Sequence, residues 1–400
     1  MRKARFRWWH PPRSVHEERD EERRVTWLEL FHDLVYVVII AELAHSLSEH
    51  VNLKGIGTFV FLFIPVWWAW INGTYYHDLH GTRDISIRIF TFLQMFAVAA
   101  MAIFAHDALG ETSTGFALAY AAHHSLLIYM WWRAGWHDAL HRSITNRYNV
   151  GYSVSVLLFV ISVFVSVPLR FVLWGVALFT DLITPTASLP LQRDDPAWGI
   201  PSASLIERFG LFTIIVLGES IVGVVQGVAE QLPLTVDVGL SGALGMVLAF
   251  GLWWTYFDFV FNRPVKPGVG WQVLWTYGHL PMVIGITAVG AGVLNVVAHE
   301  GLSLPNEVRW LLTGAITLTL TFIGVLMQIP RIDEAIKRSY RVGTLLLLSA
   351  GIAAIAVGVW GGSLTPVTLL TVLLVLMLIP IVYSVYVWLK TRIADELSLT

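Results

Sequence analysis

The chain has 400 residues, of which 56% are hydrophobic and 14% are charged, and its formal net charge is -2. A single soluble core stops growing near about 250–300 residues, so these values exclude an ordinary soluble protein. The chain has no cysteine, so disulfide bonds, thiolate chemistry and cysteine-ligated metals are excluded as well. No nucleic-acid partner is expected.

The apolar segments have the length of membrane-spanning helices. A helix needs about 20 mostly apolar residues to cross a bilayer. Twelve such runs follow one another at residues 27–48, 57–76, 88–106, 115–132, 150–168, 169–184, 205–227, 238–260, 272–298, 308–329, 342–361 and 365–389. The sequence therefore predicts an all-α integral membrane protein of about twelve transmembrane helices.

The basic residues indicate the orientation of these helices. Lysine and arginine concentrate in short cytoplasmic loops. With twelve spans and a cytoplasmic amino terminus, all of the 26 basic residues lie on the cytoplasmic side except Lys54, Arg170 and Arg309. We therefore expect both termini to be cytoplasmic. Residues 1–24 carry mixed charge and show no cleavable signal peptide, so we expect a flexible or surface-lying tail.

The chain also shows signs of an internal duplication. Residues 28–34 and 206–212 begin alike, and Trp67-Trp68 matches Trp253-Trp254, each pair being followed by an acid, Asp78 or Asp258. Because each half would hold six spans, the two halves would share one orientation, related by an axis along the membrane normal. The predicted parts are a tail (1–24), a first six-helix repeat (25–184), a Pro-rich linker (185–203), a second repeat (204–390) and a tail (391–400).

Two of these segments carry a resemblance to a known family. Leu28-Glu29-Leu30-Phe31-His32-Asp33-Leu34-Val35-Tyr36-Val37 and the segment from Glu207-Arg208-Phe209 to Gly218-Glu219-Ser220 resemble the bacterial low-temperature-requirement A family of polytopic membrane proteins. The resemblance covers roughly residues 25–390 and implies a multi-pass protein of the bacterial cytoplasmic (inner) membrane, with no established reaction. The family's signature charged positions correspond to Glu29, Asp33, Glu207, Arg208 and Glu219. The chain departs from the family pattern at His32, usually aromatic, and at Ser204, usually histidine.

The charged positions inside the spans are candidates for function, because an ionisable group inside a membrane is costly. Residues three and four apart share a helix face, so Glu29, His32, Asp33 and Tyr36 should form one polar patch. Glu219 lies deeper in its span than Arg208, between Gly218 and Ser220, small residues that let another helix approach. We expect Glu219 to bind a proton, an ion or a substrate. It is alternatively a structural group that holds helices together.

The acids at the helix starts have a similar pair of interpretations. Glu29, Asp33 and Glu207 either act with Arg208 in function, or stabilise the helix dipole and pair with Arg208 across the repeats. The matched acid Asp258 is a further candidate. His123 and His124 lie deep in the fourth span, where one of them is either a proton carrier or a neutral group that shares a hydrogen bond with Ser125, Tyr129 or a neighbouring helix.

Two histidine pairs imitate metal sites, His77 with His80 and His137 with His141. The spacing of the second pair suits one helical face, but the glutamate of a zincin helix is missing and the chain has no cysteine. We predict no metal and no cofactor, and expect solvated loops or lipid-headgroup contacts here. The glycines at 285, 290 and 292 predict close helix packing, and the tryptophans predict interfacial anchors or packing groups.

The hypothesis that follows is a transporter or permease with a cavity between the halves that opens to the cytoplasm. Glu219 would be its deepest proton- or cation-binding group, with Glu29, Asp33 and Arg208 at the inner mouth. The alternatives are a membrane-embedded enzyme that acts on lipid through surface His and Asp groups, and an envelope-maintenance or sensing protein that transports nothing. The expected partners are membrane lipids and a substrate that the sequence does not identify, a small molecule, an ion or a lipid; the oligomeric state is not predicted.

Overall fold

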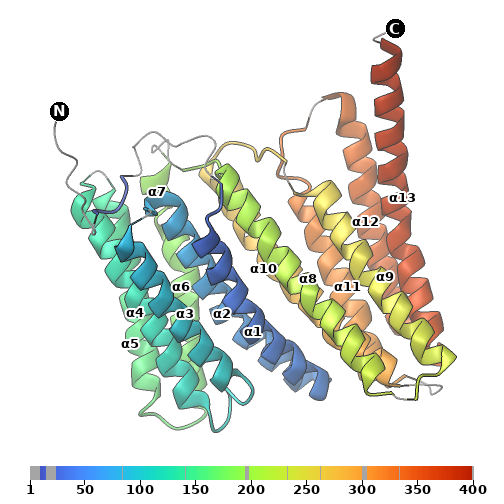
Figure 1. Cartoon of the computed structure of the whole chain (residues 1–400), viewed down its shortest axis with the longest axis horizontal. Helices are drawn as coiled ribbons and strands as arrows, with labels where there is room; N and C mark the ends of the chain where they lie inside the picture. The colour runs from blue at the N-terminus through green and yellow to red at the C-terminus, as the bar shows by residue number, and fades with distance from the viewer. Residues whose placement is uncertain are drawn as a thin grey trace. The chain divides into compact units, whose positions relative to one another are not determined.

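The computed structural model describes residues 10–14, 24–82, 84–139, 141–193, 198–231, 233–261, 263–299, 304–332 and 334–398. Within these ranges the chain is helical and forms no β-strand beyond a single isolated bridge between Val265 and Pro330. The helices (Figure 1) are α1 (Trp27–Glu49), α2 (Leu53–His80), α3 (Ile85–Ala105), α4 (Ser113–His137), α5 (Arg142–Ser162), α6 (Leu169–Ala187), α7 (Leu189–Gln192), α8 (Ala203–Ala229), α9 (Val236–Phe259), α10 (Val269–Ala298), α11 (Asn306–Leu326), α12 (Glu334–Trp360) and α13 (Pro366–Ser398).

Ten helical segments in the described part of the chain are long and apolar enough to cross a membrane. The all-helical membrane class is thereby confirmed. The two remaining long helices, α4 and α5, are less apolar. Helix α4 carries His123, His124 and Arg133, and α5 carries Asn146, Arg147 and Asn149 in its first turns. Helix α5 also starts before the predicted residue 150, since Ile144 and Tyr148 are buried and extend the helix.

The chain divides into two compact units. Unit 1 comprises Met1–Leu43, Thr58–Leu211 and Pro267–Val273, and unit 2 comprises Ala44–Gly57, Phe212–Lys266 and Leu274–Thr400. In unit 1, α3 packs on α4, α4 on α5 and α5 on α6. In unit 2, α9 and α12 each pack on α13, and α11 packs on α12. The division into two six-helix repeats with boundaries at 25–184 and 204–390 stays a prediction.

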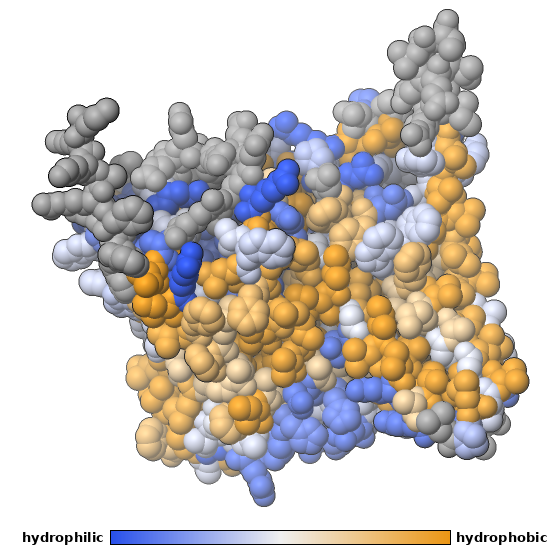
Figure 2. Space-filling view, in the orientation of Figure 1, coloured by the Kyte–Doolittle hydropathy of each residue, from blue (hydrophilic) through white to orange (hydrophobic). Residues whose placement is uncertain are grey.

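The helices keep many large apolar side chains on their surfaces. Figure 2 shows hydrophobic residues along the sides of the helices and hydrophilic residues toward the helix ends. Phe96, Ile103, Phe164, Val236 and Ile352 are among the most exposed. Because exposed apolar patches of this extent mark contact with lipid or protein, and these lie on membrane-spanning helices, the side chains contact membrane lipid.

The tryptophan pairs of the two halves do not share one environment. Trp67 and Trp68 in α2 are buried inside unit 1, whereas Trp253 and Trp254 in α9 are exposed on unit 2. Trp70 also lies in the core, against Phe209 with ring centroids 5.1 Å apart. In α2 the tryptophans are therefore packing groups, and only the α9 pair has the exposure of lipid-facing or interfacial residues.

Glycines in α10 mark close helix contacts inside unit 2, as the sequence predicts. A Cβ atom on Gly290 would lie 2.9 Å from the Cα of Ser220, and one on Gly285 would lie 3.0 Å from the carbonyl oxygen of Ala315. Gly292 lies against Leu312, with a Cβ distance of 3.3 Å. Because backbone atoms occupy the space at Gly285 and Gly290, no larger side chain fits there without movement of a helix.

Candidate functional site

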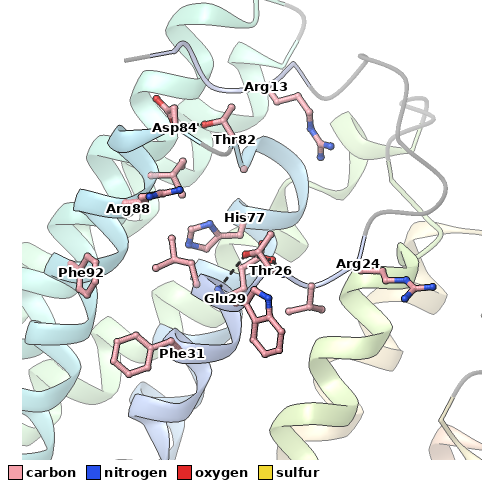
Figure 3. Close-up of a pocket in the computed structure, with 15 residues that line it drawn as sticks. Arg13, Arg24, Thr26, Glu29, Phe31, His77, Thr82, Asp84, Arg88 and Phe92 are labelled. Atoms are coloured by element: carbon pink, nitrogen blue, oxygen red, sulfur yellow. Dashed lines mark hydrogen bonds between the residues drawn. The ribbon is translucent and has the colours of Figure 1, made fainter. Parts of the chain in front are cut away.

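The start of α1 is held by a reciprocal capping arrangement. The backbone N–H of Thr26 donates to Glu29 Oε2 at 2.8 Å, and the N–H of Glu29 donates to Thr26 Oγ1 at 3.3 Å (Figure 3). The N–H of Val25 donates to Glu207 Oε2 at 3.3 Å. These bonds satisfy amide groups at the helix start. Glu29 and Glu207 therefore both fix the point at which α1 begins.

A buried ion pair joins α1 to α8 inside unit 1. Arg208 Nε donates to Asp33 Oδ2 at 3.0 Å, and Arg208 Nη2 donates to Asp33 Oδ1, so the contact is bidentate. Trp70 Nε1 donates to Asp33 Oδ1 at 2.9 Å. Both charged side chains are almost fully buried. The expected placement of Asp33 at an open inner mouth is not what unit 1 shows, because packing between α1, α2 and α8 encloses this pair.

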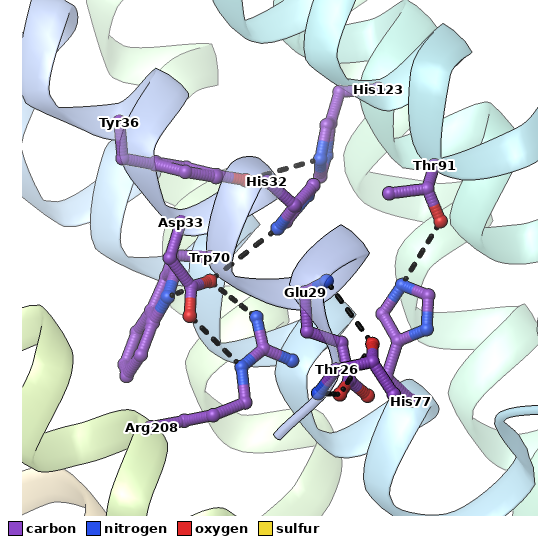
Figure 4. A network of polar contacts seen from close by, with 10 residues as sticks. All are labelled: Thr26, Glu29, His32, Asp33, Tyr36, Trp70, His77, Thr91, His123 and Arg208. Atoms are coloured by element: carbon purple, nitrogen blue, oxygen red, sulfur yellow. Dashed lines mark hydrogen bonds and ion pairs between the residues drawn. The ribbon is translucent and has the colours of Figure 1, made fainter. Parts of the chain in front are cut away.

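From this pair a line of polar side chains continues into unit 1 (Figure 4). His32 Nδ1 lies 3.5 Å from Asp33 Oδ1, and the rings of His32 and Tyr36 have centroids 5.3 Å apart. The hydroxyl of Tyr36 lies 3.4 Å from Nε2 of His123 in α4. His32, Asp33 and Tyr36 are buried on one face of α1. The polar patch expected from their spacing is therefore present, and it faces protein.

The line then reaches an aspartate that the sequence analysis did not single out. The rings of His123 and His124 have centroids 5.8 Å apart, and His124 Nε2 lies 3.2 Å from the hydroxyl of Tyr120. Tyr120 donates to Asp181 Oδ2 at 2.7 Å, and Ser155 donates to the same oxygen at 2.7 Å. A lone acid inside the sixth apolar run was the sequence signal that could have identified Asp181.

One of the expected kinds of histidine partner is present. Ser125 donates to the carbonyl oxygen of Ala121 instead of bonding to a histidine. His123 lies against Tyr36 on α1, and His124 lies against Tyr120 one turn earlier on its own helix. The partner of His123 is therefore on a neighbouring helix, which is one of the expected possibilities, whereas Ser125 is not a partner because its hydroxyl is used within its own helix.

Several atoms along this line have no hydrogen-bond partner among the described residues. They are His32 Nε2, His123 Nδ1, His124 Nδ1 and Asp181 Oδ1. All four side chains are fully buried. Buried polar atoms in proteins are nearly always paired with protein or ordered water, so each exception requires an explanation. The line therefore offers unused hydrogen-bonding positions at three histidines and one carboxyl group.

The histidines with metal-like spacing are arranged differently from the expectation. His80 and His141 are fully buried, with His141 Nδ1 3.2 Å from His80 Nε2, and the other His80 nitrogen lies 2.9 Å from the carbonyl oxygen of Arg13. His137 is exposed at the end of α4, so it does not share a helical face with His141. The predicted solvated loop is wrong at His80 and His141, because the two rings are buried against each other and Arg13 lies against His80. No group of three or more potential metal ligands occurs among the described residues.

Residues 10–14 are attached to helix ends of unit 1. Arg13 Nη2 donates to the carbonyl oxygen of Asp78 at 2.5 Å, and Ser14 Oγ donates to Asp138 Oδ2 at 2.8 Å. Of the two expectations for the tail, flexible or surface-lying, this short stretch fits the second, and the rest of the 1–24 tail lies outside the described residues apart from Arg24. The hydroxyl of Ser204 donates to Asp78 Oδ1 at 2.7 Å, which gives Ser204 a structural role.

The two remaining candidate acids belong to unit 2. Glu219 in α8 is 6% exposed, and no described residue forms a hydrogen bond or ion pair with its carboxyl group. The close approach of α10 occurs at the neighbouring Ser220, while a Cβ on Gly218 would meet nothing within 4 Å. Asp258 accepts a hydrogen bond from Ser384. Of the candidates predicted from the sequence, Asp33, Arg208, His123 and His124 are those that lie along the line of polar side chains in unit 1.

These features define a multi-pass α-helical membrane protein whose interior contains a line of ionisable side chains. Residues 24–382 match the family described as "Bacterial low temperature requirement A protein (LtrA)", and the chain belongs to that family, as the sequence resemblance implied. It is also similar to the uncharacterized protein RA0937 of Rhizobium meliloti (strain 1021), with 34% identity over 293 residues that cover 69% of this chain and 71% of that protein.

Proposed function

We propose that this protein is a proton-coupled transporter of the bacterial cytoplasmic membrane, with twelve spans in two repeats and both termini in the cytoplasm. The transported substrate is a small molecule, an ion or a lipid. The observation that carries the proposal is the buried line from Arg208 through Asp33, His32, Tyr36 and His123 to His124, Tyr120 and Asp181. Its members include the side-chain types that exchange protons near neutral pH.

The geometry of the line suits proton transfer with two short interruptions. Hydrogen-bond or ion-pair distances join Asp33 to His32, Tyr36 to His123, and His124 through Tyr120 to Asp181. The interruptions lie between His32 and Tyr36 and between His123 and His124. Both are bordered by ring nitrogens that have no protein partner. A water bound by two to four polar groups is the usual way in which such buried atoms are joined.

A purely structural network would have a different pattern of bonds. Polar groups that only hold helices together are stabilising when every member is satisfied, because a partly satisfied network in a low dielectric is costly. The Asp33–Arg208 pair meets that description, with two bonds between the charges and a third from Trp70. The histidines and Asp181 do not meet that description, because each has a side-chain atom without a hydrogen-bond partner among the described residues. We therefore assign Asp33 and Arg208 to anchoring the line, and the histidines and Asp181 to proton transfer.

Glu219 supplies a second carboxyl group, in unit 2. Its burial and its lack of a partner support the proton- or cation-binding role expected from the sequence, because an intramembrane acid without a counter-ion binds a proton or a cation at low cost. Glu29 and Glu207 have no transport role in this proposal, since their carboxylates hold the start of α1.

Proton flux into liposomes tests the proposal. Purified protein would be reconstituted with a trapped pH-sensitive dye, and a potassium-diffusion potential would drive protons inward. Asp181→Asn and His123→Gln should each slow acidification roughly tenfold or more, as expected for loss of a proton-transfer group. The matched control is His45→Gln, because His45 is an exposed histidine on α1.

The outcomes separate the proposal from its rivals. Wild-type liposomes that acidify no faster than protein-free liposomes, or an Asp181→Asn variant as fast as wild type, would overturn it. Infrared spectroscopy adds a readout that folding alone does not change, because the carbonyl band of a protonated buried carboxyl should disappear in Asp181→Asn. A lipid-acting enzyme would use histidines at the membrane surface, and His80 and His141 are not available for that role because they are buried against each other.

A further inference from the structure

A pocket of about 890 Å³ lies in unit 1 beside the first turns of α1 and α3 (Figure 3). Its wall includes the exposed side chains of Arg24 and Arg88 and the partly exposed Thr82. These residues lie before or near helix starts, the level at which a membrane protein meets water. His77 near the end of α2 also belongs to the wall and is 1% exposed. The pocket therefore extends from the water level to a buried histidine.

His77 lies next to the line of polar side chains. The rings of His77 and His32 have centroids 6.1 Å apart and meet edge to face (Figure 4). His32 itself is fully buried, does not belong to the pocket wall, and lies 3.5 Å from Asp33. Its Nε2 has no hydrogen-bond partner among the described residues. His77 thus connects the pocket with the first histidine of the line.

The hydrogen bonds of Thr91 determine which nitrogen of His77 is basic. Thr91 Oγ1 donates its single hydrogen to the carbonyl oxygen of Ile87 at 2.7 Å. It can therefore only accept from His77 Nε2, which lies 3.4 Å away. A neutral His77 then carries its hydrogen on Nε2 and its lone pair on Nδ1. Such an imidazole takes up a proton at one nitrogen and releases one from the other, as proton-shuttling histidines do.

We propose that this pocket is the aqueous entrance of the proton line and that His77 carries protons between the pocket and His32. The entrance rests on the proposed function, since it serves the same line. A proton from pocket water binds His77, and one bound water passes a proton on to His32. Only bonds to hydrogen form and break. Glu29 belongs to the same wall, but its carboxylate caps α1 and takes no part in the transfer.

Proton flux into liposomes, measured with a trapped pH-sensitive dye, tests the role of His77. His77→Ala should slow acidification roughly tenfold or more, as expected for loss of a proton-transfer group. Imidazole, at equal concentration inside and outside, should restore the flux severalfold, because it enters the pocket and replaces the lost ring. It should not restore flux in His123→Ala, since His123 is fully buried and lies outside the pocket wall. The matched control is His137→Ala, at an exposed histidine outside the pocket.

Thiol labelling tests for water in the pocket without any transport, because the chain has no cysteine of its own. Ile87→Cys places a thiol in the pocket wall, and Ile144→Cys is the matched control outside it. Both isoleucines are the third residue of a helix, and they are 4% and 2% exposed. A charged, membrane-impermeant methanethiosulfonate should modify Ile87→Cys roughly tenfold faster than Ile144→Cys, because a thiolate reacts only where water and reagent reach it.

Failure of the entrance and failure of the proton line give different results. If Asp181→Asn slows the flux but His77→Ala is as fast as wild type, the line stands and the entrance is overturned. A slow His77→Ala that imidazole does not restore, or equal labelling of the two cysteines, would overturn the entrance as well. Wild-type liposomes that acidify no faster than protein-free liposomes would instead overturn the proposed function and, with it, the relay through His77. Thermal unfolding of each variant checks that the fold is intact.

Discussion

Asp33 of α1 and Arg208 of α8, 175 positions apart in the chain, form a bidentate ion pair in the interior of unit 1. Their pairing explains why an acid and a base occupy otherwise apolar segments. A buried charge without a partner is strongly destabilising, whereas a paired and hydrogen-bonded one is tolerated. The indole of Trp70 completes the arrangement by donating to the same carboxylate.

Breaking this pair should destabilise the protein. Asp33→Asn and Arg208→Gln should each lower the free energy of unfolding by about 3–5 kcal/mol, because each leaves a buried charge without its partner. The double variant should lose less than the sum of the two. Unfolding in detergent, followed by circular dichroism, measures all three. The control Lys337→Gln, in an exposed pair with Glu334, should cost about 1 kcal/mol or less. Additive losses at Asp33 and Arg208 would contradict the pairing.

The capping arrangement at α1 predicts a local effect. Thr26→Ala removes the side-chain acceptor of the Glu29 N–H and should cost about 0.5–2 kcal/mol. Glu29→Gln keeps an acceptor for the Thr26 N–H and should cost less. Hydrogen exchange of the first turn of α1 is the measurement. Glu307→Gln, which removes an exposed acid from the first turn of α11, serves as the control and should leave α1 unchanged.

Two glycines of unit 2 should respond in opposite ways to alanine. At Gly290 the added Cβ meets the Cα of Ser220 at 2.9 Å, so one helix must move and the cost should be about 1–3 kcal/mol. At Gly218 nothing lies within 4 Å, so alanine should be neutral or stabilising by up to about 1 kcal/mol. Thermal unfolding in detergent compares the two. A Gly218→Ala variant less stable than Gly290→Ala would show that the close helix contact is misplaced.

The attachment of residues 10–14 should depend on pH through Asp84, which precedes α3 outside the membrane-spanning segments. Burial alone would raise the pKa of this carboxyl, but hydrogen bonds from Thr82, Ser86 and the N–H of His10 hold the pKa below its ordinary value of 3.8. A depressed pKa stabilises the folded state above the unfolded value, and this contribution is lost as the pH falls through the folded value.

Below about pH 4, therefore, the segment that contains His10 should detach progressively. Hydrogen exchange of residues 10–14, corrected for the intrinsic effect of pH, measures this. Asp84→Asn should weaken protection already at neutral pH and remove the acid dependence. Protection that falls with acid to the same extent in wild type and Asp84→Asn would assign the effect to another group.

Much of the architecture could be predicted because hydropathy is a local property. The membrane class and the order of the long helices follow from runs of apolar residues, which can be recognised in the sequence without knowing which helices pack together. The same reasoning placed Tyr36, His32 and Asp33 on one face of α1, since helical spacing decides which residues share a face. The same argument from helical spacing failed for His137 and His141. Helix α4 ends at His137 and α5 begins at Arg142, so the two histidines do not belong to one helix.

The sequence by itself determined the all-helical membrane class, the family and the positions at which charge enters apolar segments. Only the tertiary structure decided that Arg208 pairs with Asp33, that His123 meets Tyr36, and that Asp181 ends the polar line. The reason is physical: composition and spacing describe one helix at a time, whereas a side chain's partner depends on how neighbouring helices are rotated and packed. A buried acid is costly in any sequence, but its role follows from the groups that packing brings within hydrogen-bond distance.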